Sequence, residues 1–183
     1  MVVYSRQVIL STNMTTKPSI YVASPYGFSE AWRVFYEREY LPAIEGAGFE
    51  VIDPWVLTPQ GLVDAALTLP YGLKRREKWK ELNRIIGENN EQGIRRAVAL
   101  VASLDGVDVD SGTATEIAFA YGLGKRILGY RGDFRLASDN DGSLVNLQVE
   151  HFIYKSGGTI ATTLKEVKAT LKDWAKVCAS SDT

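Results

Sequence analysis

The pattern of apolar and polar residues divides the chain into short apolar runs and longer amphipathic segments. The runs are four to seven residues long, which is typical of buried strands in a parallel sheet. They lie at residues 19–23, 49–52, 98–104, 126–130 and 157–161. Apolar residues three or four positions apart predict helices at residues 29–46, 73–96, 111–122 and 164–178. Strands that alternate with helices predict an α/β fold with a parallel sheet and right-handed crossovers.

Two segments depart from this simple alternation. Pro42 lies inside the first predicted helix, and we expect it to bend that helix. Residues 53–71 contain Pro59, Gly61 and Pro70, and we interpret them as a long loop. A loop of this length is more typical of a lid or a binding loop than of a simple connection.

The length and composition indicate one domain. The chain has 183 residues, of which 45% are hydrophobic, and this is enough for one ordinary core. We expect residues 1–18 to be a disordered leader, with Met14 as an alternative start. The single domain is expected to span residues 19–178, followed by a tail at 179–183.

Charge and composition exclude several classes of function. The formal net charge is −1 with scattered lysines and arginines, which indicates no nucleic-acid partner and no polybasic membrane patch. No apolar run approaches the ~20 residues of a membrane span. With only Cys178 and His151, the chain cannot form an internal disulfide or a histidine-based metal site. We expect a cytoplasmic protein that uses no metal and no cofactor.

Acidic residues follow the third apolar run. Asp105, Asp108 and Asp110 lie in a short loop, and Glu116 lies early in the helix that begins near Ser111. A carboxylate there is expected to lie near unpaired backbone N–H groups and the positive end of the helix dipole, which favours its ionised form. Ligands of parallel sheets bind at this edge. From the residues alone, however, such acids are more often solvated turn and capping residues.

Several motifs, taken in order, resemble the nucleoside 2-deoxyribosyltransferase family. The most specific is the Asp-Ser-Gly-Thr-Ala-Thr-Glu run at 110–116, and the resemblance extends from Ser19 to about Trp174. The weaker motifs are Ser-Ile-Tyr-Val-Ala-Ser-Pro at 19–25, Leu-Asp-Gly at 104–106, Gly-Lys at 124–125 and Asn-Leu at 146–147. The resemblance implies a flavodoxin-like three-layer sandwich, with a five-stranded parallel sheet, helices on both faces, and assembly into homodimers or larger homo-oligomers with shared active sites.

The same resemblance implies an activity and catalytic residues. Enzymes of this family move a 2-deoxyribosyl group between nucleobases through a covalent intermediate on a glutamate, so the expected partners are small-molecule nucleosides and free nucleobases. Glu116 resembles the nucleophile, Asp110 its partner near the leaving base, and Tyr21 the tyrosine that hydrogen-bonds the nucleophile. We expect the crowded acids to raise the pKa of Asp110, so that it shares a proton with the base while Glu116 stays ionised.

Five further residues are expected to bind substrate. Ser24 and Phe28 lie in the turn after the first strand, and Asn146 resembles an asparagine that a neighbouring subunit lends to the 5′ side of the sugar, with Gln148 just beyond it. Asn90 stands where relatives often have an aspartate that contacts the base. Asparagine can hydrogen-bond a base but supplies no proton at neutral pH, which leaves open the general acid and the preferred base.

Three hypotheses of function follow. The first is a retaining nucleoside 2-deoxyribosyltransferase, in which a carboxylate below C1′ captures an oxocarbenium-like sugar. The second is a nucleoside 5′-monophosphate N-glycosidase, which needs a phosphate cradle; the first turn offers hydroxyls but no arginine before Arg33, which favours an unphosphorylated substrate. The related-looking phosphoribohydrolases have paired glycines where this chain has Asp110 and Ser111. The third is a nucleotide-sensing module without turnover.

Overall fold

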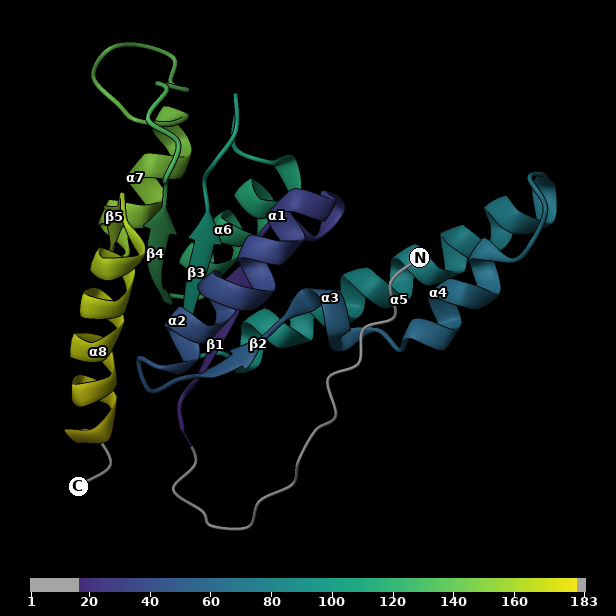
Figure 1. Cartoon of the computed structure of the whole chain (residues 1–183), viewed down its shortest axis with the longest axis horizontal. Coiled ribbons are helices and arrows are strands. Elements are labelled where there is room, and N and C mark those ends of the chain that lie inside the picture. The colour runs from purple at the N-terminus through teal and green to yellow at the C-terminus, as the bar shows by residue number, and fades with distance from the viewer. Residues whose placement is uncertain (1–16, 181–183) are drawn as a thin grey trace.

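A five-stranded parallel sheet forms the centre of the protein (Figure 1). The structure is a computed structural model and describes residues 17–180. The strands are β1 (Ser19–Ala23), β2 (Glu50–Ile52), β3 (Ala99–Ser103), β4 (Arg126–Tyr130) and β5 (Thr159–Ala161). Their order is β2-β1-β3-β4-β5 and every neighbouring pair is parallel. The α/β prediction and all five predicted strands are therefore confirmed, each strand within two residues of its predicted ends.

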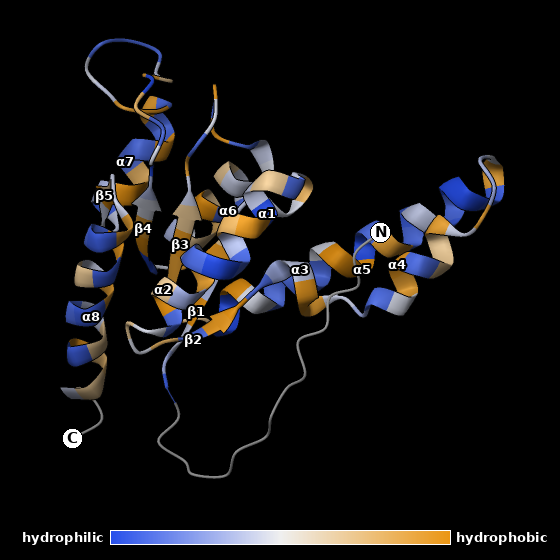
Figure 2. Cartoon of the chain, viewed as in Figure 1, coloured by the Kyte–Doolittle hydropathy of each residue, from blue (hydrophilic) through white to orange (hydrophobic). Residues whose placement is uncertain are grey.

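Helices cover both faces of the sheet and complete a three-layer sandwich. Along β1, Ile20 and Val22 face one core and Tyr21 and Ala23 face the other, because successive side chains of a strand point to opposite faces. The first core is closed by α1 (Glu30–Phe35), α2 (Leu41–Glu45) and α8 (Leu164–Ser180), and the second by α5 (Leu73–Arg96), α6 (Ser111–Gly122) and α7 (Leu147–Lys155). Figure 2 shows the apolar strands between helices whose outer faces are hydrophilic.

The first predicted helix is interrupted before Pro42. A π-helical turn, η2 (Tyr36–Tyr40), separates α1 from α2, and the backbone N–H of Leu41 bonds to the carbonyl of Tyr36, five residues back. Pro42 has no N–H to continue the α-helical ladder and lies in the first turn of α2. The irregularity that was expected at Pro42 is therefore a π-helical turn just before it, in which the backbone hydrogen bonds change register.

The prediction of an irregular loop at residues 53–71 was wrong. This segment contains α3 (Pro54–Leu57) and α4 (Gln60–Leu67). The side chain of Asp53 accepts a hydrogen bond from the backbone N–H of Trp55 and caps α3, and Pro54 occupies the first helical position. The helix α7, to which the pattern analysis assigned no element, is capped in the same way by Asn146.

One part of the structure extends away from the sheet. Helix α5 has 24 residues and is about 36 Å long, and its first half projects from the body together with α4 (Figure 1). We call this projecting hairpin, residues 60–87, the arm. Within residues 17–180, no helix is both long enough and apolar enough to cross a bilayer. Residues 1–16 and 181–183, which include most of the expected leader and tail, lie outside the described part of the chain.

Candidate active site

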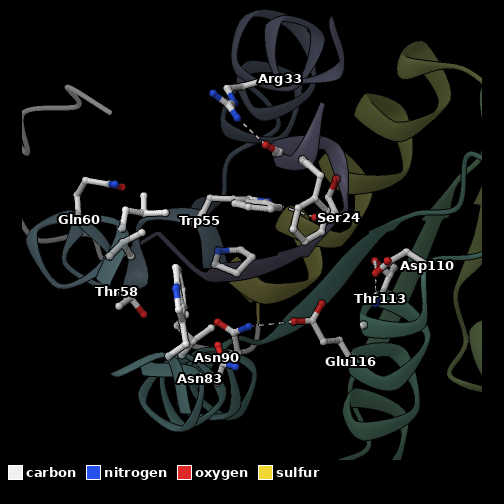
Figure 3. A pocket seen from close by; sticks show the side chains of 18 residues that line it. Ser24, Arg33, Trp55, Thr58, Gln60, Asn83, Asn90, Asp110, Thr113 and Glu116 are labelled. Atoms are coloured by element: carbon white, nitrogen blue, oxygen red, sulfur yellow. Dashed lines mark hydrogen bonds between the residues drawn. The ribbon is translucent and has the colours of Figure 1, made fainter. Parts of the chain in front are cut away.

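A cavity of about 690 Å³ opens at the carboxyl ends of β1 and β3 (Figure 3). It is lined by the turn after β1, by α1, by residues 54–67, by one face of α5 and by the start of α6. The strand order reverses between β1 and β3, and open parallel sheets bind ligands at such a point. The cavity therefore lies where this topology places a ligand site.

Glu116 reaches the cavity from α6 and is held by residues of two other elements. The phenol of Tyr21, on β1, donates a hydrogen bond of 2.6 Å to Oε1 of Glu116. Nδ2 of Asn90, on α5, donates a longer one of 3.5 Å to the same oxygen. Helix α5 can approach β1 closely because residue 93 is a glycine. A Cβ at this position would lie only 3.1 Å from the ring of Tyr21. The three predicted residues Tyr21, Asn90 and Glu116 thus meet in one place.

The electrostatic state of Glu116 differs from the expectation. Burial raises the pKa of Glu116 to about 7; the hydrogen bond from Tyr21 lowers this pKa, and the charge of Asp110 raises it. Glu116 is the sixth residue of α6, beyond the unpaired N–H groups of the first turn, so the helix dipole does not offset its burial. The prediction that the helix start favours the ionised carboxylate was therefore wrong. Burial also raises the pKa of Tyr21, which keeps its proton and remains the donor.

Asp110 caps α6 and shares the cavity with Glu116. Its Oδ2 accepts hydrogen bonds from the backbone N–H of Thr113 at 3.0 Å and from Oγ1 of Thr113 at 3.2 Å. The other two acids of the loop are engaged elsewhere: Asp108 accepts from the N–H of Val109, and Asp105 accepts from Tyr26. We expected all the acids of the loop to crowd Asp110. In the structure the acid that interacts with it is Glu116.

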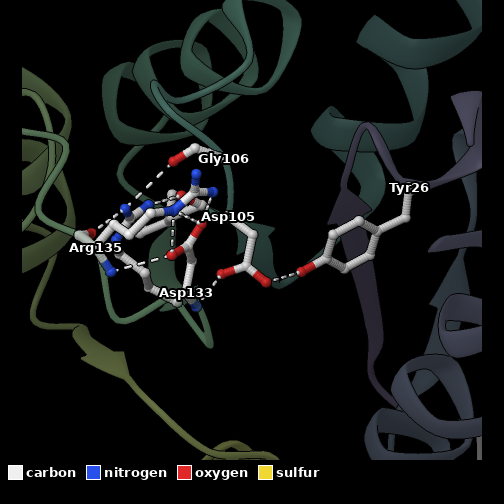
Figure 4. Close-up of polar contacts among 7 residues, drawn as sticks. Tyr26, Asp105, Gly106, Asp133 and Arg135 are labelled. Atoms are coloured by element: carbon white, nitrogen blue, oxygen red, sulfur yellow. Dashed lines mark hydrogen bonds and ion pairs between the residues drawn. The ribbon is translucent and has the colours of Figure 1, made fainter.

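Asp105 fixes the loop that carries Asp110 (Figure 4). Its Oδ2 accepts a 2.7 Å hydrogen bond from the phenol of Tyr26, and its Oδ1 accepts one of 2.8 Å from the backbone N–H of Asp133. The carboxylate of Asp133 forms an ion pair with Arg135. Asp105 thus joins the turn after β1 to the loops after β3 and β4.

The expected substrate-binding residues divide into two groups. Ser24, Phe28 and Asn90 line the cavity, and Asn146 and Gln148 do not. Oδ1 of Asn146 caps α7 by accepting from the N–H of Gln148 at 3.0 Å, and its Nδ2 donates to Asp139. Within one chain, these two residues stay apart from Glu116.

One wall of the cavity is aromatic and was not predicted from the sequence. The indole N–H of Trp55 donates to the carbonyl of Ser24 at 3.2 Å, and its ring packs edge-on against Phe28, with centroids 4.7 Å apart. A Cβ on Gly27 would lie 2.3 Å from this indole, so only glycine permits the contact. Trp55 was missed because the segment was interpreted as a loop, although the Asp-Pro pair before it is a helix-start signal.

Two further sets of lining residues were also missed. Arg33 lines the cavity and donates a 2.7 Å hydrogen bond to the carbonyl of Gly27. Trp79, Asn83 and Ile86 line it together with Asn90. The spacing of these four residues, at 79, 83, 86 and 90, is that of one helix face and was visible in the sequence.

Comparisons with solved structures agree with this topology. A conserved protein from Enterococcus faecalis V583 is 19% identical with a TM-score of 0.63, covering 86% of this chain and 98% of its own. The 2-deoxyribosyltransferase from Bacillus psychrosaccharolyticus is 21% identical with a TM-score of 0.53, covering 84% and 95%. The enzyme from Leishmania mexicana is 20% identical with a TM-score of 0.57, covering 87% and 97%. These likenesses establish a shared flavodoxin-like fold.

The family assignment rests on the sequence. No curated protein matches the chain. Residues 20–152, which contain Tyr21, Asn90, Asp110 and Glu116, match the family described as nucleoside 2-deoxyribosyltransferase. The chain therefore belongs to the nucleoside 2-deoxyribosyltransferase family of glycosyl-transferring enzymes.

Proposed function

We propose that this protein exchanges the base of a 2-deoxyribonucleoside for a free base, with Glu116 as the nucleophile. The observation that carries the proposal is the partly buried carboxylate of Glu116, which is hydrogen-bonded by Tyr21 and lies in the same cavity as Asp110. The cavity presents two carboxyl groups together with the aromatic side chains of Trp55 and Phe28. We place the reaction in nucleoside salvage in the cytoplasm.

The reaction is a double displacement with retention at C1′. An oxygen of Glu116 forms a bond to C1′ as the bond between C1′ and the base nitrogen breaks, and that electron pair leaves with the base. The leaving base takes a proton from Asp110. In the second half, the incoming base attacks C1′ through a ring nitrogen, returns its N–H proton to Asp110 and releases Glu116 as a carboxylate.

Each neighbouring group has a distinct part in this scheme. The hydrogen bond from Tyr21 stabilises the carboxylate form of Glu116, the form that attacks. Asn90 orients Glu116 through its Nδ2 and contacts the base with its amide. Because the amide does not titrate, the proton for the leaving base comes from Asp110 rather than from Asn90.

Base exchange and covalent trapping test this proposal directly. The protein is incubated with thymidine and adenine, and separately with 2′-deoxyinosine and cytosine, and all species are followed by chromatography. Exchange by the wild-type protein and its loss in folded Glu116→Ala support the proposal. Mass spectrometry after incubation with a 2′-fluorinated donor should find the sugar on Glu116; exchange that persists in Glu116→Ala, or a sugar on another residue, contradicts it.

Arg33 supports a second candidate, a nucleoside 5′-monophosphate N-glycosidase. Its guanidinium is the one basic group among the described residues that line the cavity, and it bonds to the carbonyl of Gly27 in the turn after β1, the turn that also carries Ser24. A phosphate could bind there through charge-assisted hydrogen bonds. Release of free base and deoxyribose 5-phosphate from a deoxynucleoside monophosphate, with little base exchange, favours this candidate over the transferase.

We also propose that the active form is a homodimer or a larger homo-oligomer. Asn146 and Gln148 lie outside their own chain's cavity, at the start of α7, where a neighbouring subunit could receive them. Sedimentation combined with activity measurements at decreasing protein concentration tests the idea. Loss of activity on dissociation, and in Asn146→Ala at concentrations that keep the assembly intact, supports it; full activity in a monomer contradicts it.

A further inference from the structure

The cavity extends well beyond the space that a nucleoside needs at Glu116. Trp79, Asn83, Ile86 and Asn90 line it from one face of α5. Asn90 lies eleven positions after Trp79, which corresponds to about 16 Å along the helix axis. A nucleoside with its C1′ at Glu116 lies beside Asn90 and is shorter than this face. The part of the cavity toward Trp79 therefore remains for another chemical group.

This distal end lies between the two helices of the arm and has an apolar character. We define it by Val63 and Leu67 of α4 and by Trp79 and Ile86 of α5. Its polar lining residues, Gln60 and Asn83, are uncharged amides. The charged residues among the described lining residues are Arg33, Asp110 and Glu116, and these lie on other elements. An apolar, neutral group fits the distal end, and a phosphate would lose its hydration there without a cation to replace it.

The arm holds the distal end open through its own packing. Ala66 of α4 and Leu82 of α5 are almost fully buried between the two helices, with exposed fractions of 0% and 1%. The side chain of Gln60 donates to Asp64 within α4 at 3.0 Å. The wall is thus formed without a ligand, as is usual for small-molecule sites.

The base, rather than the sugar, faces the distal end. Asn90 lies on α5 between Glu116 and the distal end, and its Nδ2 points to Glu116. Its Oδ1 is buried and has no hydrogen-bond partner within residues 17–180, so it is placed for a donor such as an exocyclic amino group of a base. A substituent on that amino group would continue along α5 toward Trp79.

We propose that the enzyme accepts nucleobases with a bulky apolar substituent, specifically a purine with an aromatic ring on its exocyclic amino nitrogen. The ring would lie against Trp79 between α4 and α5. This inference rests on the proposed function in one respect only, the placement of C1′ at Glu116. Burial of the ring is expected to lower the KM for N6-benzyladenine about 10-fold relative to adenine.

The test compares adenine with N6-benzyladenine as acceptors, with thymidine as the donor. Binding of each base to the wild-type protein is measured in parallel by tryptophan fluorescence, which needs no turnover. Tighter binding and a lower KM for N6-benzyladenine support the proposal. A KM or dissociation constant that is equal to or above that of adenine overturns it. If no base is exchanged, the proposed function fails, and the fluorescence titration still decides whether the distal end binds the ring.

Variants of the arm locate the bound ring. Leu67→Trp fills the distal end and should abolish the preference for N6-benzyladenine over adenine. Leu62→Trp is the matched control, because Leu62 lies on the same helix, is 37% exposed and does not line the cavity. Trp79→Ala, which removes bulk and cannot fail by overpacking, should reduce the same preference. Equal preferences in Leu67→Trp, Trp79→Ala and the control overturn the assignment, as does a preference for 5′-O-benzyl-2′-deoxyadenosine over base-substituted donors.

Discussion

The phenol of Tyr21 donates a 2.6 Å hydrogen bond to Oε1 of Glu116, joining the first strand to a helix 95 residues further along the chain. Two opposing effects meet at this carboxyl group. Burial raises the pKa of Glu116, whereas the hydrogen bond lowers it, and the outcome is a pKa of about 7. A nucleophile with this pKa is about half ionised at neutral pH, so activity should respond to small changes around the site.

Tyr21→Phe should shift the pH dependence of catalysis upward. The substitution removes the hydrogen bond that favours the carboxylate and keeps the ring in the core, so the pKa of Glu116 rises above 7. We expect the acid limb of the kcat/KM profile, which reports the free enzyme, to move up by about 1 pH unit. At pH 6.5 this corresponds to a loss of about 10-fold, with partial recovery at pH 9.

Tyr154→Phe is the control for this experiment, because Tyr154 is 48% exposed on α7 and lies outside the cavity. Its profile should match that of the wild-type protein. An acid limb in Tyr21→Phe that coincides with the wild-type limb would show that this hydrogen bond does not set the ionisation of the nucleophile.

Glu116→Gln should stabilise the fold at alkaline pH while removing activity. The folded pKa of about 7 lies above the ordinary glutamate value of 4.5, so the stabilising contribution of neutral Glu116 is complete below pH 4.5 and is lost as the pH rises through 7. Glutamine has the same shape and no charge. At pH 8 we expect the variant to have a free energy of unfolding about 2 kcal/mol above the wild-type value, after allowance for partial exposure.

Urea denaturation at several pH values provides the measurement. The difference between Glu116→Gln and the wild-type protein should shrink to near zero at pH 4.5. A difference that is constant with pH would come from packing rather than from ionisation, and would contradict the raised pKa.

The main features of the fold are predictable from the sequence because its strands are buried on both faces. The apolar run at residues 98–104 predicts a central parallel strand, and β3 occupies Ala99–Ser103 within it. The shorter helices gave weaker signals. Helices α4 and α7 have eight and nine residues, little more than two turns, so a periodic pattern scarcely develops before it ends. The α4 half of the arm was therefore not predicted, whereas its α5 half belongs to the helix predicted at residues 73–96.

The candidate active site was also predictable only in part. The order of motifs indicated Tyr21, Asp110 and Glu116, but the alternation in β1 did not decide which face Tyr21 occupies. Pairing of β1 with β3 and the covering helix α5 settle this, and they depend on the tertiary structure. The pKa of Glu116 was predicted in the wrong direction because burial, which dominates it, is not a local property of the sequence.

Tyr26→Phe should destabilise the loop that carries Asp110. The variant keeps the aromatic packing against Trp32 and Tyr40 and removes only the 2.7 Å hydrogen bond to Asp105. Because the acceptor is a partly buried carboxylate, we expect the free energy of unfolding to fall by about 1–3 kcal/mol and kcat to fall with it.

Asp105→Asn should lower the free energy of unfolding by a similar amount, and the double variant should lower it by less than the sum of the two. Asp108→Asn, in the exposed part of the same loop, should change the free energy of unfolding by less than about 0.5 kcal/mol; additive effects of Tyr26→Phe and Asp105→Asn would contradict the coupling.

Asn90→Asp should replace the neutral amide beside Glu116 with a carboxyl group that competes with Glu116 for one proton. Nδ2 of Asn90 lies 3.5 Å from Oε1 of Glu116, and a carboxylate in its place would put two like charges within about 4 Å in a partly buried site. Such a pair retains one proton until the pH rises well above the pKa of either group alone. We expect the acid limb of the kcat/KM profile to move up by at least about 1 pH unit.

In Asn90→Ala, which loses only a long hydrogen bond, the acid limb should move by less than about half of that. The pH profiles of the three proteins with one good and one poor leaving base provide the measurement. If the limb of Asn90→Asp coincides with that of Asn90→Ala, then Asn90 does not act on the nucleophile through its lack of charge, and its amide serves the base alone.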